Sequence, residues 1–556
     1  MNKRILSAVM AAAMLVSMAA CSGAASSTAP ASSTAPASSA APAASSSAAP
    51  AASSEAAPEK ELLTITGYYP MHASHATDDI PADGWRIDRM YEEMFNVEFD
   101  WYEVPATNEE EQYNITIASG DIPDLVFQSN WKKLNNYKDA WWVLDDFLAT
   151  GNYPNLSKYT LEDSYNYALS ANNDGQVQIL SMWSEQFVGD GLLIRGDLVE
   201  DWGLTIENDM TKEEFADLLR FAKEKDPNIV PYMTRKNLNG MVQRLCEGWS
   251  GLRENVVYQE DGTAIWGGAA DGMKEVVTWL NSLYNEGLID TEFPTTDTAA
   301  WQEKVLGENT GVFVTHDNIS SRIDWAQKEW AKLGVTDKWY TAITPLSPDG
   351  TTKGQTTIHY PRQRQCGAIF IGADEAKVER ILEMLDYNLS PEGVVLHRYG
   401  IEGESFNYAA DGSVELIAEY QDAVAADTMP HEDVIKGNMS YLILEANGIY
   451  SEAKKDYPNV KASGELYEQG GYIRSDLANP VRYTEDEQDV ISKYEADIKT
   501  YTSEQLTKFI TGIAPIDQWD AYVAGFSDYH LDEYMAAVNS AAARAYALVG
   551  NATGNT

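Results

Sequence analysis

The chain of 556 residues contains only three cysteines, at positions 21, 246 and 366. This number and spacing fit neither a disulfide framework nor a metal-binding cluster. We expect Cys246 and Cys366 to be buried thiols. A single long-range disulfide between them is the alternative, because an oxidising compartment would permit it. With 44% hydrophobic residues, the chain has enough apolar surface to build a core without cross-links.

Positive charge is also scarce. Lys and Arg total 40 against 85 Asp and Glu, which gives a net charge of −45. Such an excess of negative charge repels the phosphates of nucleic acids and the headgroups of anionic lipids. The balance therefore argues against a nucleic-acid partner. It favours solubility but names no ligand.

The apolar run at residues 5–20 is too short, and wrongly flanked, for a stable membrane-spanning helix. Lys3 and Arg4 precede it, and small residues end it directly before Cys21. A charged start, a short apolar stretch and a small-residue cleavage site are typical of a secretory signal peptide. We predict a signal peptide over residues 1–20.

The position of Cys21 resembles a bacterial lipobox, in which the cysteine becomes the lipidated first residue of the mature chain. Met18 stands where leucine is usual. Residues 22–58 are almost entirely Ala, Ser, Pro and Thr, a composition that cannot bury enough surface to fold. The prediction is a lipidated Cys21 followed by a disordered tether over 21–60. An ordinary secretory cut beside an incidental cysteine is the alternative.

Alternating strands and helices are predicted beyond the tether. Strands are expected at 62–66, 97–101 and 123–127, and helices at 87–95 and 108–118. A β-α-β-α-β order of this kind favours a largely parallel sheet covered by helices.

Further elements are marked by periodicity and caps. Helices are expected at 211–222 behind a capping box, at 273–284 ending at Gly287, at 378–389, and over most of 485–548; strands are expected at 311–314 and 340–346, and hairpin turns at Asp261-Gly262 and Asp349-Gly350.

Several segments carry a family resemblance, and they follow one another along the chain in the order that the family has. They are ASGDIPD at 118–124, 144–148 with 153–156, 193–198 with 202–204, LYNEGLID at 283–290, LDYNLSPEG at 385–393 with YGIEGE at 399–404, and 509–512 with Trp519. Together they resemble the extracellular solute-binding lipoproteins of bacterial ABC importers, in the carbohydrate-associated branch of Gram-positive bacteria.

The resemblance implies an α/β, two-lobed periplasmic-binding-protein-like fold, with a hinge and with mixed or parallel sheets flanked by helices. Lobe 1 is expected over 61–182 plus 363–410, and lobe 2 over 183–362 plus 411–556 with the C-terminal helices. It implies a monomeric binder without enzymatic activity, cofactor or metal, held by lipid at the outer face of the cytoplasmic membrane. The lobes would close over a carbohydrate, expected to be an oligosaccharide, and deliver it to permease subunits.

Ligands of such sheets bind beyond the carboxyl ends of strands, and sugars need aromatic faces together with polar side chains. The predicted ligand-binding residues are Tyr68, His72 and Asp78 in a first loop, then Gln128, Ser129 and Trp131, Trp183, Trp249 and Ser250, Asp317 and Asn318, Arg364, and Glu402 and Glu404. Packing is the alternative role for each aromatic residue, and loop capping is the alternative for the two glutamates.

Other functions stay open at this point. Glu402 and Glu404 would serve a secreted carbohydrate-active enzyme if they formed a glycosidase pair. The same fold would also suit a binder of peptides or other polar solutes, or a ligand-sensing partner of a membrane kinase.

Overall fold

The computed structural model describes residues 60–70, 85–105, 108–128, 131–162, 164–184, 190–235, 237–259, 261–307, 311–358, 362–418, 458–475 and 481–552. The predicted signal peptide, Cys21 and the predicted tether up to residue 59 lie outside these ranges, as do His72, Asp78 and Ser129. No helix in the described ranges combines the length and apolarity that a membrane crossing requires.

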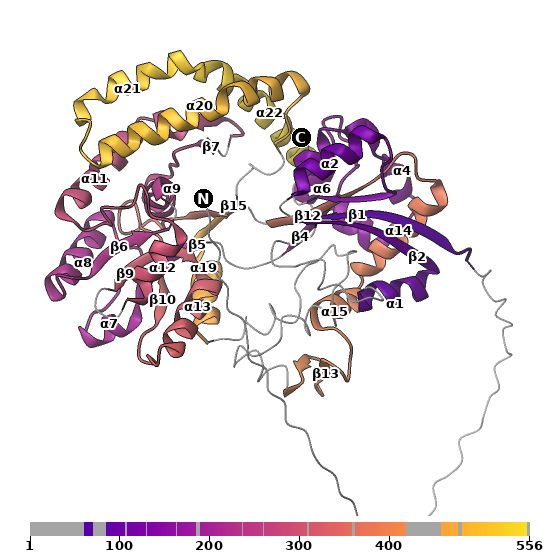
Figure 1. The fold of residues 1–556 in the computed structure, drawn as a ribbon, viewed down its shortest axis with the longest axis horizontal. Coiled ribbons are helices and arrows are strands. Elements are labelled where there is room, and N and C mark those ends of the chain that lie inside the picture. Colours follow the sequence, from indigo (N-terminus) through magenta and orange to yellow (C-terminus); the bar gives the residue numbers. More distant parts are fainter. Residues whose placement is uncertain are drawn as a thin grey trace, which may run out of the picture. The chain divides into compact units, whose positions relative to one another are not determined.

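A first sheet has the strand order β2-β1-β3-β12-β4 (Figure 1). Its strands are β1 (Leu63–Pro70), β2 (Val97–Val104), β3 (Leu125–Gln128), β4 (Leu180–Ser184) and β12 (Arg362–Ile369). The first three strands pair in parallel, and α1 (Arg86–Phe95) and α2 (Glu109–Ser119) connect them, which confirms the predicted β-α-β-α-β unit. Strand β12 runs antiparallel to both of its neighbours, so the sheet is mixed.

The two faces of this sheet bury different hydrophobic clusters, because successive side chains of a strand point to opposite faces. Leu125 and Phe127 belong to a cluster that includes residues of α14 (Glu375–Asn388). Val126, between them, belongs to a second cluster with Tyr68 and Cys366. The sheet is therefore covered on both sides, as parallel strands require.

A second sheet has the order β10-β5-β9-β6. It consists of β5 (Asp190–Arg195), β6 (Val230–Thr234), β9 (Val312–Asn318) and β10 (Tyr340–Ile343), with β6 and β9 parallel. Helix α8 (Lys212–Lys225) begins with the predicted capping box between Thr211 and Glu214. Helix α11 (Met273–Glu286) ends at Gly287 in the left-handed conformation, also as predicted.

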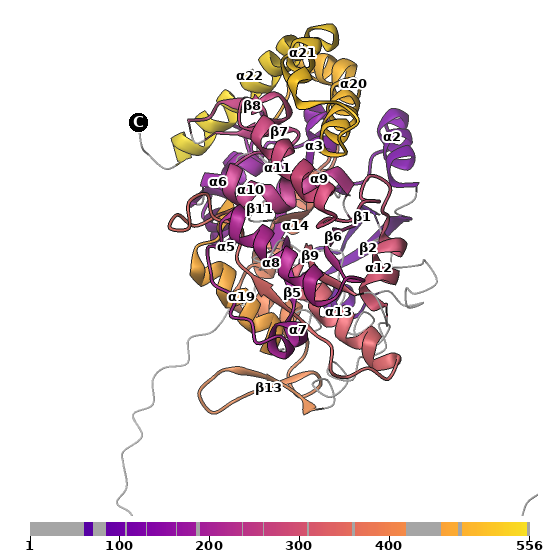
Figure 2. The ribbon, with the colours of Figure 1, turned by 90° about the vertical axis from the view of Figure 1, so that its left-hand side faces the viewer.

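The C-terminal helices α20 (Glu485–Ile510), α21 (Trp519–Gly525) and α22 (Leu531–Ala552) confirm the predicted helical end of the chain. In both ribbon views they lie beside α11 and the hairpin of β7 (Val256–Tyr258) and β8 (Ala264–Trp266) (Figures 1 and 2). Trp266 fixes this packing, because its indole nitrogen donates to Thr502 Oγ1 at 3.0 Å and its ring meets Tyr534 edge to face. These helices therefore share one core with the second sheet.

Further helices and strands connect or flank these elements. They are α3 (Trp131–Asn135), α4 (Asp145–Leu148), α5 (Pro154–Ser157), α6 (Ser164–Ser170), α7 (Gly196–Asp201), α9 (Asn237–Met241), the π-helical turn η5 (Val242–Cys246), α10 (Glu247–Ser250), α12 (Thr298–Leu306), α13 (Ile319–Lys332), β11 (Thr356–Ile358), α15 (Pro391–Tyr399), β13 (Phe406–Tyr408), β14 (Val414–Leu416), α19 (Pro458–Gly470) and β15 (Ile473–Ser475).

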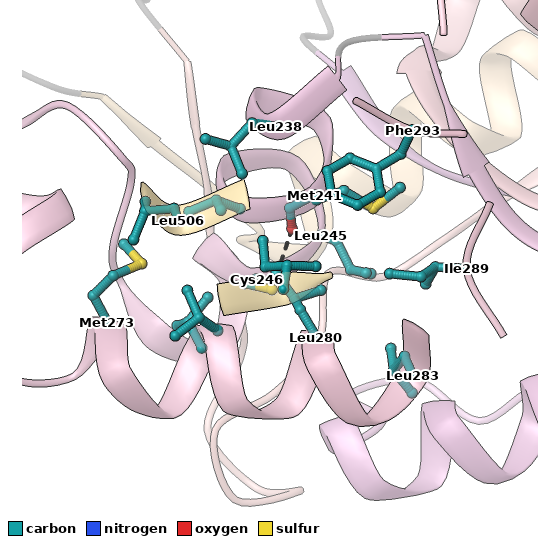
Figure 3. Packing of buried hydrophobic residues seen from close by; sticks show 14 of the residues in the cluster. Leu238, Met241, Leu245, Cys246, Met273, Leu280, Leu283, Ile289, Phe293 and Leu506 are labelled. Atoms are coloured by element: carbon teal, nitrogen blue, oxygen red, sulfur yellow. Dashed lines mark hydrogen bonds between the residues drawn. The ribbon is translucent and has the colours of Figure 1, made fainter. Parts of the chain in front are cut away.

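Both described cysteines are free, buried thiols, as predicted. Cys246 lies among leucine, methionine and isoleucine side chains, and its thiol donates to the Met241 carbonyl at 3.3 Å (Figure 3). Cys366 donates to the Gln128 carbonyl at 3.4 Å. Burial raises the pKa of both thiols, so neither is a reactive thiolate near neutral pH.

Two local predictions were wrong. The chain was expected to leave the first strand after Thr66, but β1 continues to Pro70. Gly67 is not a turn residue there; the ring of Trp101 occupies the space where a Cβ would stand. Asp349-Gly350 forms a turn, but no hairpin, because β11 pairs with β15 and not with β10.

Candidate functional site

One edge of the first sheet gathers several of the predicted ligand-binding residues. The ends of β1, β3 and β4 lie at this edge together with the start of β12, since β12 is antiparallel to its neighbours. The register places Cys366 opposite both Gln128 and Ser181, and Gln363 opposite Trp183. Arg364 lies at the register shift between Gln363 and Gln365. The predicted residues of three separate strands therefore meet at one sheet edge.

Gln128, the last residue of β3, is fully buried. Its amide oxygen and nitrogen form no hydrogen bond of normal geometry within the described part of the chain. The amide nevertheless lies near the Tyr68 hydroxyl, where it opposes the rise in the pKa of that tyrosine. A buried amide without a full set of partners is costly, which makes Gln128 a strong candidate for a group that a ligand satisfies.

Tyr68 was expected in a loop, but it lies within β1 and is fully buried. Its hydroxyl donates to the Glu109 carbonyl at 3.2 Å, and its ring meets Tyr102 and Tyr113 edge to face. Burial raises its pKa well above the usual range. These contacts give Tyr68 a packing role beneath the edge.

The backbone positions of three other predicted residues follow from their elements. Trp131 begins α3, and Trp183 is the fourth residue of β4. Arg364 was expected before the strand that returns to the first sheet, but that strand already begins at Arg362, so Arg364 lies inside it. Their roles as ligand residues stay predictions.

The second sheet has an equivalent edge, where β6 and β9 end and β5 begins. Asp317 and Asn318 are the last two residues of β9, which is longer than the sequence indicated. Arg235 directly follows β6 and binds Asp317 with two guanidinium nitrogens, Nε at 2.5 Å from Oδ2 and Nη2 at 3.0 Å from Oδ1. The backbone N–H of Asn318 donates to Oδ1 of the same carboxylate at 2.7 Å.

A second guanidinium lies at this carboxylate. Arg322 of α13 places its Nε 3.4 Å from Asp317 Oδ1 and lies over the ring of Trp325, 5.9 Å from the ring centre. The Asp317 side chain is only 1% exposed, whereas those of Arg235 and Arg322 are 18% and 24% exposed. The carboxylate is therefore buried beneath two arginines that reach the surface.

Trp249 and Ser250 are engaged in local packing. The Trp249 ring meets Trp279 edge to face and carries the Lys212 ammonium 4.7 Å from its centre. The Ser250 hydroxyl donates to the Cys246 carbonyl at 2.8 Å and accepts from the Leu252 amide at 3.1 Å. These contacts occupy much of both side chains, and their predicted role at a ligand remains untested.

Glu402 and Glu404 are exposed. Arg86, at the start of α1, donates to both carboxylate oxygens of Glu404 at 2.6 and 2.8 Å and lowers the pKa of that carboxyl. A carboxylate held in this way is a poor general acid, because such an acid needs a raised pKa.

The sequence prediction missed Arg235 and Arg322. Arg235 could have been found only by identifying the strand at 230–234, which was not predicted. Arg322 depends on the helix that starts directly after Asn318.

A scan against models of known protein families gives no match. Three curated proteins are similar in sequence. "Lipoprotein LipO" of Bacillus subtilis is 25% identical over 323 residues, 54% of this chain and 60% of its own. "Polygalacturonan/rhamnogalacturonan-binding protein YtcQ" of the same species is 22% identical over 59% of this chain and 64% of its own. The chain thus spans less than two thirds of the length of both proteins.

The third relative aligns over more of its length. "Fructooligosaccharide ABC transporter substrate-binding protein FusA" of Streptococcus pneumoniae is 22% identical in an alignment of 481 residues, and the match covers 80% of this chain and 84% of that protein.

Solved structures decide the fold. A solute-binding protein of Bifidobacterium longum infantis, described as binding HMO and associated with an ABC transporter, superposes with a TM-score of 0.68 at 15% identity. It covers 86% of this chain and 98% of its own. The chain has the fold of the ABC-importer solute-binding proteins. The alginate-binding protein AlgQ2 supports this with a TM-score of 0.62 at 22% identity, over 86% of this chain and 98% of its own. The predicted two-lobed α/β fold is confirmed.

Proposed function

We propose that the protein is the extracellular, lipid-anchored binding component of an ABC importer, and that it binds an oligosaccharide and delivers it to a membrane permease. The alignment with FusA carries this proposal. It covers 80% of the chain, more than either predicted lobe alone contains, so it extends over both. The relatives whose names state a ligand, FusA and YtcQ, are both described as carbohydrate binders.

The connections between the sheets support a site between their two strand-end edges. Strand β4 ends at the edge of the first sheet at Ser184, and β5 begins at the edge of the second at Asp190. A connection of this length spans at most about 20 Å. The return path runs from the end of β10 through β11 to the start of β12, again from one edge to the other. Both crossings therefore join the two edges, as a hinge behind a ligand site requires.

A thermal-shift screen over mono- and oligosaccharides tests binding. A ligand at 100 times its Kd stabilises the folded state by about 2.7 kcal/mol, so the right sugar should raise Tm measurably. Chromatography of the incubated sugar should show no product, since a binder releases its ligand unchanged. A Tm that no sugar moves, or that only peptides move, would contradict the proposal. Product formation that Glu402→Gln abolishes would favour an enzyme instead.

The lipid anchor can be tested separately. Cys21→Ala should move the protein from the membrane fraction to the culture medium, because it removes the predicted site of lipidation. Immunoblots of the two fractions measure the change. Cys246→Ala is the matched control, since Cys246 is a buried thiol and its loss should leave the protein at the membrane. An unchanged membrane fraction of Cys21→Ala would rule out this anchor.

A further inference from the structure

We infer that the ligand is an acidic oligosaccharide, and that a uronate carboxylate of the ligand binds Arg322 beside Asp317. This inference rests on the proposed function and adds the chemical class of the sugar. It starts from the charge at the edge of the second sheet, where two guanidiniums surround one carboxylate.

The Asp317 carboxylate already has its hydrogen bonds. Arg235 donates two hydrogen bonds, and the backbone N–H of Asn318 donates a third. Arg322 Nε stands 3.4 Å away as an ion-pair partner only, and this buried nitrogen has no hydrogen-bond partner in the described ranges. The other contact of this side chain there is the ring of Trp325. Arg322 thus has a charge that Asp317 only partly balances and terminal N–H groups still available for a ligand.

The position of Arg322 fits a ligand contact. It lies in the first turn of α13, which begins directly after β9 ends, and its side chain is 24% exposed above a carboxylate that is almost completely buried. A guanidinium in such a place can bind a carboxylate through two parallel N–H···O bonds. A neutral sugar hydroxyl carries no negative charge and so cannot form an ion pair with the Arg322 guanidinium.

The edge of the first sheet adds arginines of its own. Arg362 and Arg364 are the first and third residues of β12. Because β12 is antiparallel to β3 and β4, its start lies at the edge where those two strands end. The whole chain has only 40 Lys and Arg against 85 Asp and Glu. In so acidic a protein, a partly exposed guanidinium such as that of Arg322 is a local exception to the negative charge, and it points to an anionic ligand at this edge.

The test is calorimetric titration with acidic trisaccharides, such as those of polygalacturonate and alginate, and with neutral ones, such as maltotriose, xylotriose and kestose. The most tightly bound acidic sugar is then compared with its methyl ester, which keeps the ring and removes the charge. Esterification should weaken binding by about 10- to 100-fold, the range for a charge-assisted hydrogen-bonded pair. Binding of the acid should also weaken with added salt.

Variants locate the effect. Arg322→Gln should weaken binding of the acid about 10- to 100-fold and leave binding of the ester nearly unchanged, whereas Arg322→Lys should retain part of the preference for the acid. Arg220→Gln is the matched control, because Arg220 is an exposed arginine paired with Glu286 and Asp217 on α8 and α11. Arg220→Gln should change neither the affinity for the acid nor the affinity for its ester. Thermal unfolding of each variant shows that it is folded.

Four results would overturn the inference. A neutral sugar as the tightest ligand would leave the proposed function standing and remove the acidic class. Equal binding of acid and ester would also remove the acidic class. Equal losses for acid and ester in Arg322→Gln would remove the proposed contact between Arg322 and the uronate. If no sugar of either kind binds, both the proposed function and the inference fail.

Discussion

Acidification from pH 7 to pH 4 is expected to cost about 3 kcal/mol of folding free energy through one side chain, His397, because its folded pKa lies roughly 2.5 units below the ordinary value. His397 is buried in α15. The Tyr91 hydroxyl lies 3.0 Å, and the Asn388 amide nitrogen 2.8 Å, from its Nε2. The amide nitrogen of Asn388 can only donate, so it favours an unprotonated, accepting Nε2 and hence the neutral ring.

Burial lowers the pKa of His397 to about 4. In the unfolded chain an ordinary histidine has a pKa of about 6.5. The unfolded state therefore takes up a proton between pH 6.5 and 4, while the folded state does not. The neutral ring makes its full contribution to the free energy of unfolding above pH 6.5. This contribution declines as the pH falls and is lost below pH 4.

Urea unfolding at pH 7.5 and at pH 4 measures this, with His397→Gln as the comparison. Glutamine keeps a polar side chain but does not titrate. Between the two pH values, the free energy of unfolding of the wild type should fall by about 3 kcal/mol more than that of the variant. The carboxylates contribute equally to the wild type and the variant, so their effect cancels. His530→Gln, at a histidine that is 57% exposed, is the control. Parallel losses in wild type and His397→Gln would show that His397 is not the responsible group.

Replacing Glu247 by Ala is expected to destabilise the fold by about 3–5 kcal/mol. Glu247 and Arg253 form an ion pair of 2.7 Å between side chains that are only 4% and 7% exposed. Removing the carboxylate takes the 2.7 Å ion-pair partner from a buried guanidinium, so the cost of desolvating that charge is less fully offset.

The double variant Glu247→Leu with Arg253→Met separates this effect from lost packing. It removes both charges, so its stability should lie closer to that of the wild type than Glu247→Ala does. Glu286→Ala breaks the exposed pair with Arg220 and should cost about 1 kcal/mol or less. Urea midpoints at pH 7.5 measure all three. A similar loss from Glu247→Ala and Glu286→Ala would contradict the buried-charge explanation.

Local signals in the sequence predicted the elements well. The capping box at Thr211 marks the start of α8. The left-handed glycines at 120 and 287 mark the ends of α2 and α11. Pairing between distant segments was harder to foresee. The length of β1 depends on its partners β2 and β3, and the turn at Asp349 leads to a strand whose partner begins at Ile473.

The same limit applies to the site. Asp317 and Asn318 could be predicted as candidates because they closely follow the apolar run at 311–314. The partner of Asp317 could not, because Arg235 lies 82 residues away and reaches it only through the parallel pairing of β6 with β9. Charge pairs across a sheet follow from register, which one sequence does not display.

Strand β12 constrains the order in which the chain can fold as it is synthesised from its N-terminus. It fills the gap between β3 and β4, so these two strands have no neighbour on their facing sides until residues 362–369 have emerged. All four strands of the second sheet emerge earlier, since β10 ends at Ile343. The second sheet can therefore be completed first, while open strand edges of the first wait for the returning strand. Until β12 is made, the strands between Leu63 and Ser184 therefore keep open edges, which are the usual starting points of aggregation.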